Sequence, residues 1–318
     1  MIADLVAGPR SEEPLGRGLE GRIGIDIGGT KTEAVALDAE GRIESSVTVP
    51  TVRGADAVVA TSETVVAALA ERTGRRIGEF VSVGVGIPGQ VDREGGLVSH
   101  AVNLGVTSLA LGPALAERTG LPVSIDNDVT AAALGAAHLM GLTGTMAYLN
   151  LGTGLAAGIV VDGRPWRGAR GVAGEIGHLP VDPLGRPCPC GQRGCLETVA
   201  SGSALRSSWP AGGDHPGRRI LAAIAEGDDE ARAAFEHLVA GAAACVRLLA
   251  LSVDPETVVV GGGLRLLGAP LEDGLRSKLD GWAAGSPFLA ALGLSERVRM
   301  LAADSPAAAV GAAFAGER

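Results

Sequence analysis

Residues 25–30 read Ile25-Asp26-Ile27-Gly28-Gly29-Thr30, and a similar stretch, Leu149-Asn150-Leu151-Gly152-Thr153-Gly154, recurs near the middle of the chain. Each stretch is a short apolar strand that turns sharply at glycine. Two such turns at corresponding places in a chain indicate a duplicated unit. The 318 residues are enough for two domains of ordinary size.

The apolar periodicity predicts a mixed α/β order of elements. The predicted strands are Arg22–Ile27, Ala34–Leu37, Arg42–Val49, Phe80–Ile87, Val123–Ile125, Met146–Leu151, Ala157–Val161 and Thr257–Val260. The predicted helices are Ala55–Arg72, Leu109–Arg118, Val129–Met140, Gly202–Leu205, Arg218–Ala225, Glu230–Ser252, Leu271–Ala283 and Pro306–Ala315. We expect Asp128 to be the N-cap of the helix that begins at Val129.

The composition argues against two classes of partner. The net charge of −9 would repel a nucleic-acid backbone, and no basic stripe with interleaved aromatic residues occurs. The longest apolar stretch, Leu238–Val253, contains Arg247 and is short for a bilayer span. Residues 1–21 lack the pattern of a secretory signal and are predicted to form a loose tail. We therefore expect a cytoplasmic protein with neither nucleic acid nor membrane as a partner.

The glycine turns suit an anionic ligand. Without Cβ atoms at Gly28 and Gly29, backbone N–H groups can approach phosphate, and Thr30 and Lys31 can donate to its oxygens. Asp26 could hold a hydrated magnesium ion. Gly152-Thr153-Gly154 would face the same nucleotide, and a third turn, Gly261-Gly262-Gly263, would let the backbone pass close to a flat purine ring. An ordinary hairpin is the alternative for any one turn alone.

Residues 178–195 contain His178, Cys188, Cys190 and Cys195, which are three of the four cysteines and one of the five histidines of the chain. Three thiolates and one imidazole form a closed tetrahedral set typical of structural zinc. A disulfide is the alternative, which a chain poor in cysteine and without a secretory signal does not favour. Four protein ligands leave no open position for a catalytic water. The remaining cysteine, Cys245, is predicted to be buried as a small apolar residue.

Several polar residues could recognise a polyhydroxyl ligand such as a sugar. Their oxygens and nitrogens offer many hydrogen-bonding groups, and Asp128 follows a predicted strand at the start of a helix. A purely structural role as a helix cap is the alternative for Asp128. The set comprises Asn103, Asn127, Asp128, Glu175, His178 and Glu197.

These motifs together resemble the ROK family of sugar kinases and repressors, over residues 22–315. The resemblance rests on the glycine turns, Gly86-Ile87-Pro88-Gly89, Asn103-Leu104-Gly105, Asn127-Asp128, Gly174-Glu175-Ile176-Gly177-His178 and the cysteine cluster followed by Glu197. It implies an actin-like, hexokinase-like (ribonuclease H-like) fold with a central cleft and a structural zinc loop. The implied domains are 22–126 plus 305–318 and 127–304.

The resemblance also implies roles for matching residues in an ATP-dependent hexose kinase. Asp128 would be the general base for the sugar's 6-hydroxyl. The other sugar contacts would be Asn103, Asn127, Glu175, His178 and Glu197. The nucleotide and its Mg²⁺ would be bound by Asp26, Gly28, Gly29, Thr30, Lys31, Thr153, Gly154, Gly262 and Gly263. His178, Cys188, Cys190 and Cys195 would hold Zn²⁺.

Glucose is the expected substrate, with N-acetylglucosamine, N-acetylmannosamine, mannose or fructose as alternatives and a sugar sensor without catalysis as another. Family members that regulate transcription carry a helix-turn-helix ahead of the first glycine turn, where this chain has residues 1–21. Members are often homodimers or homotetramers. The family commonly has further glycines after Gly154, whereas this chain has Leu155-Ala156-Ala157, so a position that requires positive φ would be strained.

Overall fold

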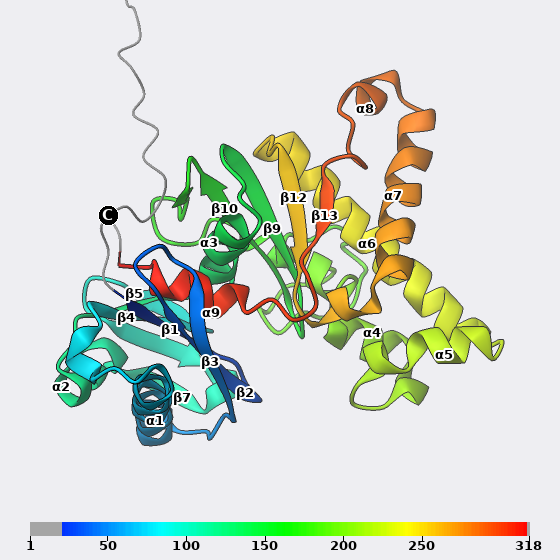
Figure 1. The fold of residues 1–318 in the computed structure, drawn as a ribbon. Coiled ribbons are helices and arrows are strands. Elements are labelled where there is room, and N and C mark those ends of the chain that lie inside the picture. Colours follow the sequence, from blue (N-terminus) through cyan, green and yellow to red (C-terminus); the bar gives the residue numbers. More distant parts are fainter. Residues whose placement is uncertain (1–20, 317–318) are drawn as a thin grey trace, which may run out of the picture.

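The computed structural model describes residues 21–316, so the predicted tail lies outside the described residues except for Gly21. Two five-stranded sheets organise the molecule (Figure 1). The first sheet has the order β3-β2-β1-β4-β8. Its strands are β1 (Arg22–Ile27), β2 (Lys31–Leu37), β3 (Ile43–Pro50), β4 (Ser82–Ile87) and β8 (Val123–Asn127).

The second sheet repeats this pattern in the order β11-β10-β9-β12-β13. In each sheet the first three strands along the chain are antiparallel neighbours and the last two add in parallel. The repeated topology confirms the duplication indicated by the two glycine turns. The strands are β9 (Thr145–Leu151), β10 (Leu155–Val161), β11 (Arg164–Pro165), β12 (Thr257–Gly261) and β13 (Val298–Met300).

Two helices lie between the sheets, as Figure 1 shows: α3 (Asp128–Leu139) and α9 (Ala307–Ala313). They approach so closely that a Cβ atom at Gly135 would collide with the carbonyl oxygen of Ala307. Glycine is therefore required for this backbone contact. The final helix thus returns the chain to β1 and β4 of the first sheet.

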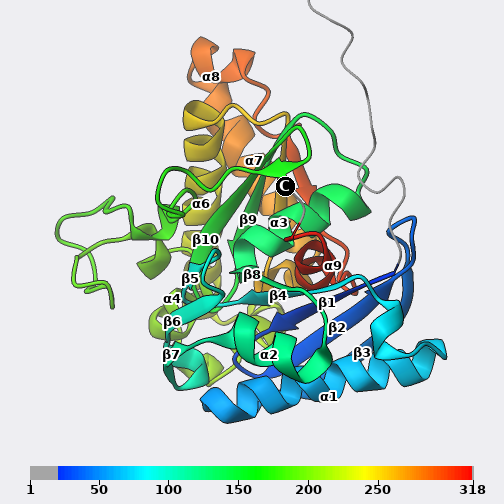
Figure 2. The same ribbon diagram turned by 90° about the vertical axis from the view of Figure 1, so that its left-hand side faces the viewer.

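The outer faces of the sheets are covered by other helices. Helices α1 (Ala55–Thr73) and α2 (Leu111–Thr119) enclose a core with the first sheet (Figure 2), beside a small sheet of β5 (Gln90–Asp92), β6 (Leu97–Ala101) and β7 (Val106–Leu109). On the second sheet, alternate residues point to opposite faces. Leu149 and Val260 pack toward α6 (Asp229–Ser252), whereas Tyr148 and Val259 pack toward α3.

Helix α6 is long and apolar enough to cross a membrane by length and composition, but 56% of its apolar window is buried inside the protein. It packs with α7 (Ala269–Ala284) over the second sheet, and Cys245 lies fully buried on it, as predicted. Shorter helices complete this side of the molecule: α4 (Gly202–Ser208), α5 (Ile220–Ala225) and α8 (Pro287–Ala291).

All predicted strands and helices occur, with ends shifted by a few residues. The structure adds β5, β6, β7, β11, β13 and α8, which are all five residues long or shorter. One prediction is wrong: Asn127, not Asp128, is the N-cap of α3, since its Oδ1 accepts hydrogen bonds from the N–H groups of Val129 (2.9 Å) and Thr130 (3.3 Å).

Candidate functional site

The junction between β8 and α3 lies between two cavities. Asp128, the first residue of α3, lines a cavity of about 330 Å³ on one side. Asn127 lines a larger one of about 900 Å³ on the other. The cap interaction occupies only Oδ1 of Asn127, so its side-chain NH₂ group is left for a ligand. Ligands bound in the two cavities would therefore approach each other beside Asp128.

The smaller cavity brings together several residues predicted to bind the nucleotide. Its lining includes Asp26, Lys31, Asp128, Gly262 and Gly263. Three residues not foreseen as site residues, Tyr148, Asn150 and Arg265, also line it. Asp26 comes from the end of β1 and Tyr148 and Asn150 from the corresponding strand β9 of the second sheet, so the duplication supplies both walls.

Two carboxyl groups in this cavity have raised pKa values. Burial raises the pKa of Asp128 to about 6, and the charge of Glu175 raises it further. Burial also raises the pKa of Asp26 to about 8, with Asp128 and Glu33 acting in the same direction and Lys31 opposing them. A carboxyl that titrates near neutral pH is suited to accept a proton. A cation beside Asp26 would remove the penalty on its charged form.

The triple-glycine turn is held rigidly against this cavity. Gly262 has φ 76°, a conformation that favours glycine. Its N–H donates to the hydroxyl of Tyr148 (3.2 Å), and its carbonyl oxygen accepts from Arg265 Nη1 (2.9 Å). Arg265 Nη2 also donates to the carbonyl oxygen of Ala303 (2.9 Å). No short motif marks the roles of Tyr148 and Arg265, which depend on long-range contacts.

The turn at residues 152–154 forms the hairpin between β9 and β10, with Leu151 opposite Leu155. Glu197 Oε2 accepts from the N–H of Leu155 (2.9 Å), which places this predicted sugar contact against the hairpin. The Leu155-Ala156-Ala157 segment causes no strain, since it lies in β10. Among the described non-glycine residues, only His100, Asp162 and Asp254 have positive φ.

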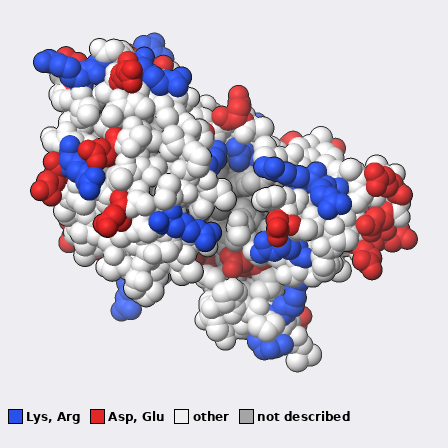
Figure 3. All heavy atoms as spheres, turned by 90° about the horizontal axis from the view of Figure 1, so that it is seen from below, with Lys and Arg blue, Asp and Glu red and all other residues white. Residues whose placement is uncertain are grey.

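The larger cavity holds three of the predicted sugar-binding residues, Asn127, Glu175 and His178. It also contains Asp126 and Arg167, which no sequence motif marks as site residues. Figure 3 shows a hollow on one face of the molecule, with Lys and Arg side chains and also Asp and Glu side chains at its edge. The amide of Asn127, the carboxylate of Glu175 and the imidazole of His178 can hydrogen-bond several hydroxyl groups at once.

The other predicted residues line neither cavity in the described structure. Asn103 is exposed in a short 3-10 helix (Val102–Leu104) beside the first glycine turn, where a Cβ at Gly29 would lie 3.4 Å from its own Cβ. Gly28 N–H donates to the carbonyl oxygen of Lys31 (3.0 Å), which closes that turn. The members of this group are Asn103, Glu197, Gly28, Gly29, Thr30, Thr153 and Gly154.

The four predicted metal ligands converge. One donor atom from each of His178, Cys188, Cys190 and Cys195 lies within 4.8 Å of all the others. The Sγ atoms of Cys190 and Cys195 are 3.7 Å apart, as are Cys188 Sγ and His178 Nδ1. Zn–S bonds of about 2.3 Å at tetrahedral angles place sulfur atoms about 3.8 Å apart. The set therefore fits zinc.

The metal set and the larger cavity share one side chain. If His178 binds the metal through Nδ1, its Nε2 faces Glu175, whose Oε2 lies 4.0 Å away. Metal binding would then fix the orientation of the imidazole at the cavity wall.

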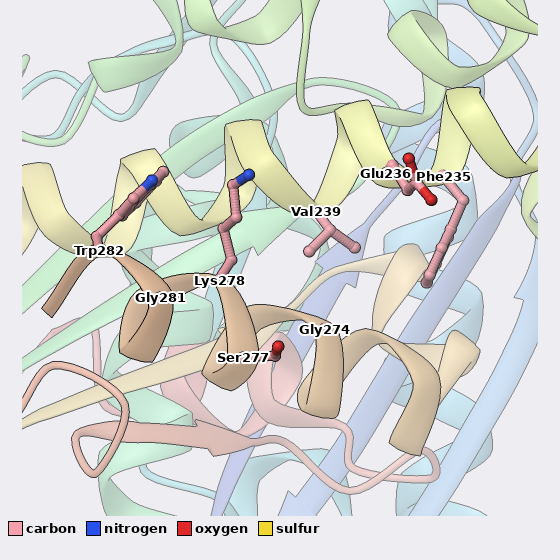
Figure 4. Close-up of a pocket in the computed structure, with 8 residues that line it drawn as sticks. All are labelled: Phe235, Glu236, Val239, Gly274, Ser277, Lys278, Gly281 and Trp282. Carbon is pink, nitrogen blue, oxygen red and sulfur yellow. The ribbon is translucent and has the colours of Figure 1, made fainter. Parts of the chain in front are cut away.

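A third hollow, of about 540 Å³, lies between α6 and α7 (Figure 4). Phe235 and Val239 come from α6, and Lys278 and Trp282 from α7. None of the predicted site residues lines it. The candidate site is therefore the β8–α3 junction, where the predicted residues gather.

Comparisons with known proteins place the chain in a family. Residues 22–315 match the ROK family. A glucokinase of Streptomyces coelicolor is 36% identical over 83% of this chain and 88% of its own length. An N-acetyl-D-glucosamine kinase of Escherichia coli is 35% identical over 76% of this chain and 83% of its own. The structure of a ROK family glucokinase from Streptomyces griseus, in complex with glucose and AMPPNP, is 33% identical with a TM-score of 0.76, covering 93% and 98% of the two chains.

Proposed function

Because this chain belongs to the ROK family and is a sugar kinase, we propose that it transfers the terminal phosphate of ATP to the 6-hydroxyl of glucose. The observation that carries this proposal is the position of Asp128 between the two cavities. Glucose is the proposed substrate because glucokinases are among the relatives of this chain.

Asp128 is the proposed general base. It would accept the proton of the 6-hydroxyl while the sugar oxygen forms a bond to the terminal phosphorus of ATP and the bond to ADP breaks. Its Oδ1 accepts the N–H of Val129 (3.0 Å), which fixes the carboxyl group and leaves Oδ2 for the proton. Phosphoryl transfer depends mainly on positioning and on stabilisation of charge. A base held at a rigid helix start meets the first requirement.

The smaller cavity is the proposed ATP site. Lys31 and the turns at Gly28-Gly29-Thr30 and Thr153-Gly154 would contact phosphates, and Gly262-Gly263 would border the adenosine. Asp26, whose pKa burial raises to about 8, fits a magnesium site because a nearby cation stabilises its charged form. Magnesium would supply neutralisation of the phosphate charge.

The larger cavity is the proposed sugar site. Asn127, Glu175, His178 and Glu197 would hold hydroxyl groups, and Asn103 would approach them when the cleft closes around both substrates. We propose that residues 22–126 with 305–318 and residues 127–304 are the units that move. Zinc would orient His178 without taking part in the chemistry. We place the reaction in the cytoplasm and expect a homodimer or homotetramer.

N-acetylglucosamine is the second candidate substrate. N-acetyl-D-glucosamine kinases are among the relatives. N-acetylmannosamine, mannose and fructose would present their hydroxyl groups to the same set of polar side chains.

The test is an ADP-release assay with MgATP and each of these five sugars. We expect the highest kcat/KM with glucose and none with 6-deoxyglucose, which lacks the reacting hydroxyl. A higher kcat/KM with N-acetylglucosamine would reassign the substrate. Tight sugar binding in calorimetry without ADP release would instead identify a sensor.

A further inference from the structure

We propose that the ion pair between Asp126 and Arg167 is a positioning device, which sets the loop carrying Glu175 at a fixed distance from Asp128. This inference rests on the proposed function for its catalytic meaning. Neither residue belongs to the set of nucleotide, sugar or metal ligands described above. Both line the larger cavity.

Asp126 is the penultimate residue of β8 and lies two positions before the base. Its side chain is only 5% exposed, so its charge requires compensation. Arg167 Nε donates to Oδ2 of Asp126 (3.0 Å), and Arg167 Nη2 donates to the same oxygen. The other carboxylate oxygen, Oδ1, accepts the N–H of Asn127 (3.0 Å). The aspartate is thus tied both to the junction and to Arg167.

Arg167 fixes the start of the loop that leads to Glu175. It follows β11, the edge strand of the second sheet, and its carbonyl oxygen accepts from the N–H of Ala173 (3.1 Å). This segment contains Gly168, Gly171 and Gly174, all with positive φ. Its far end is tied to β10, where the N–H of Ala157 donates to the carbonyl oxygen of Gly174 (2.7 Å). The side chain of Arg167 is therefore an anchor between this loop and the first sheet.

A second arginine reaches the same carboxylate from another direction. Arg93, in the turn after β5, places Nε 3.6 Å from Oδ2 of Asp126 and donates through Nη2 to the carbonyl oxygen of Ala315 (2.8 Å). One buried carboxylate thus joins the small sheet, the first sheet and the loop of the second sheet. Removing Arg167 would leave Asp126 with the longer contact to Arg93 and would release the Arg167 end of the Glu175 loop, while Gly174 would stay bonded to β10.

The experiment compares Arg167→Ala with a matched control, Arg297→Ala. The two arginine side chains are 22% and 21% exposed, and Arg297 also bonds an aspartate and backbone oxygens, on a loop outside both cavities. We expect Arg167→Ala to raise the KM for the accepted sugar at least tenfold while the KM for ATP changes less than twofold. Arg167→Lys should recover part of the loss. Arg297→Ala should lower thermal stability without changing the sugar KM.

Hydrogen exchange of residues 168–178 provides a readout that needs no turnover. Faster exchange of this segment in the Arg167 variants than in Arg297→Ala supports the anchor even if no hexose is phosphorylated, an outcome that would defeat only the proposed function. Should Arg167→Ala not fold, the same two measurements apply to Arg167→Lys. Equal sugar KM values and equal exchange of this segment in the Arg167 and Arg297 variants would overturn the proposal.

Discussion

The four metal donors come from a single stretch of eighteen residues, 178–195, whereas the side chains around Asp128 come from both sheets and from loops far apart in the chain. In the first region, short spacing and tight turns bring the ligands together. In the second, strand order does so, since β1, β8 and β9 each deliver a polar residue at a strand end. We call residues 178–195 the metal loop and the side chains of Asp26, Asn127, Asp128 and Asn150 the cleft floor. The metal loop is assembled by contacts that are close in the sequence, whereas the cleft floor is assembled by contacts between distant parts of the chain.

This difference predicts how each region responds to substitution. A substitution in the metal loop should mainly lower the affinity for the sugar, because it would alter the positions of His178 and Glu175. A change at the cleft floor should act on the chemical step or on the electrostatics of both cavities. The following predictions test that separation.

Asp128→Asn should give the largest effect. The amide keeps the size of the side chain but cannot accept the proton, so we expect kcat to fall by about 10²- to 10⁴-fold. Sugar affinity in calorimetry should change little, because the amide still hydrogen-bonds. Turnover close to that of the unmodified protein in the ADP assay would remove Asp128 from the base role.

Cys195→Ser should separate the two regions. Cys195 is fully buried among the metal donors, and its loss should release the ion and free the ring of His178. We expect loss of zinc in elemental analysis and a sugar affinity lowered by about 10- to 100-fold, with ATP affinity within twofold. The matched control is Cys245→Ala, at a buried cysteine outside the metal set, which should retain zinc. Normal sugar affinity in a zinc-free Cys195 variant would show that the loop does not shape the sugar site.

The fold was largely predictable because its long strands and helices carry clear apolar periodicity. The elements that the prediction missed are short. Strand β5 spans three residues without a buried one, and α8 spans five, so neither offers a periodic pattern. The N-cap was misassigned by one residue because Asn127 and Asp128 are adjacent and both are good caps.

The candidate site was predictable where ligands are close in sequence. The metal donors converge as their spacing predicts. Arg167, in contrast, lies 41 residues from Asp126, and no local motif joins them. Likewise, the sequence around Tyr148 predicts only a strand. In the structure, its hydroxyl accepts a hydrogen bond from the N–H of Gly262. Such contacts follow from topology, which single-sequence patterns describe only coarsely.

A pH profile probes the cleft floor without mutation. Burial raises the pKa of Asp128 to about 6, so the charged base disappears as the pH falls through that value. We expect kcat/KM to fall about tenfold per pH unit below 6 and to level off above it. Activity should return when protein held at pH 5 is assayed at pH 7, which excludes denaturation. A profile that stays flat from pH 7 to 5 would contradict the raised pKa.

Asp26→Asn should give the smallest effect, on stability rather than on rate. Burial raises the pKa of Asp26 from 3.8 to about 8. Between these values the folded protein holds a proton that the unfolded chain has lost, so this group lowers the stability of the fold progressively as the pH rises through that window. An asparagine at this position does not titrate, so its contribution to the stability of the fold does not fall as the pH rises. In the absence of nucleotide and magnesium, the thermal midpoint of Asp26→Asn should therefore exceed that of the unmodified protein by a few degrees at pH 8 and match it near pH 4.

Asp38→Asn is the control of opposite sign for this last comparison. Slight burial would raise the pKa of Asp38, but hydrogen bonds from Arg42 hold it below its usual value. Its stabilising contribution is present above the unfolded pKa and is lost as the pH falls, so this variant should be less stable than the unmodified protein at pH 8. A pH-independent difference for Asp26→Asn would mean that the carboxyl at the cleft floor is better solvated than its surroundings indicate.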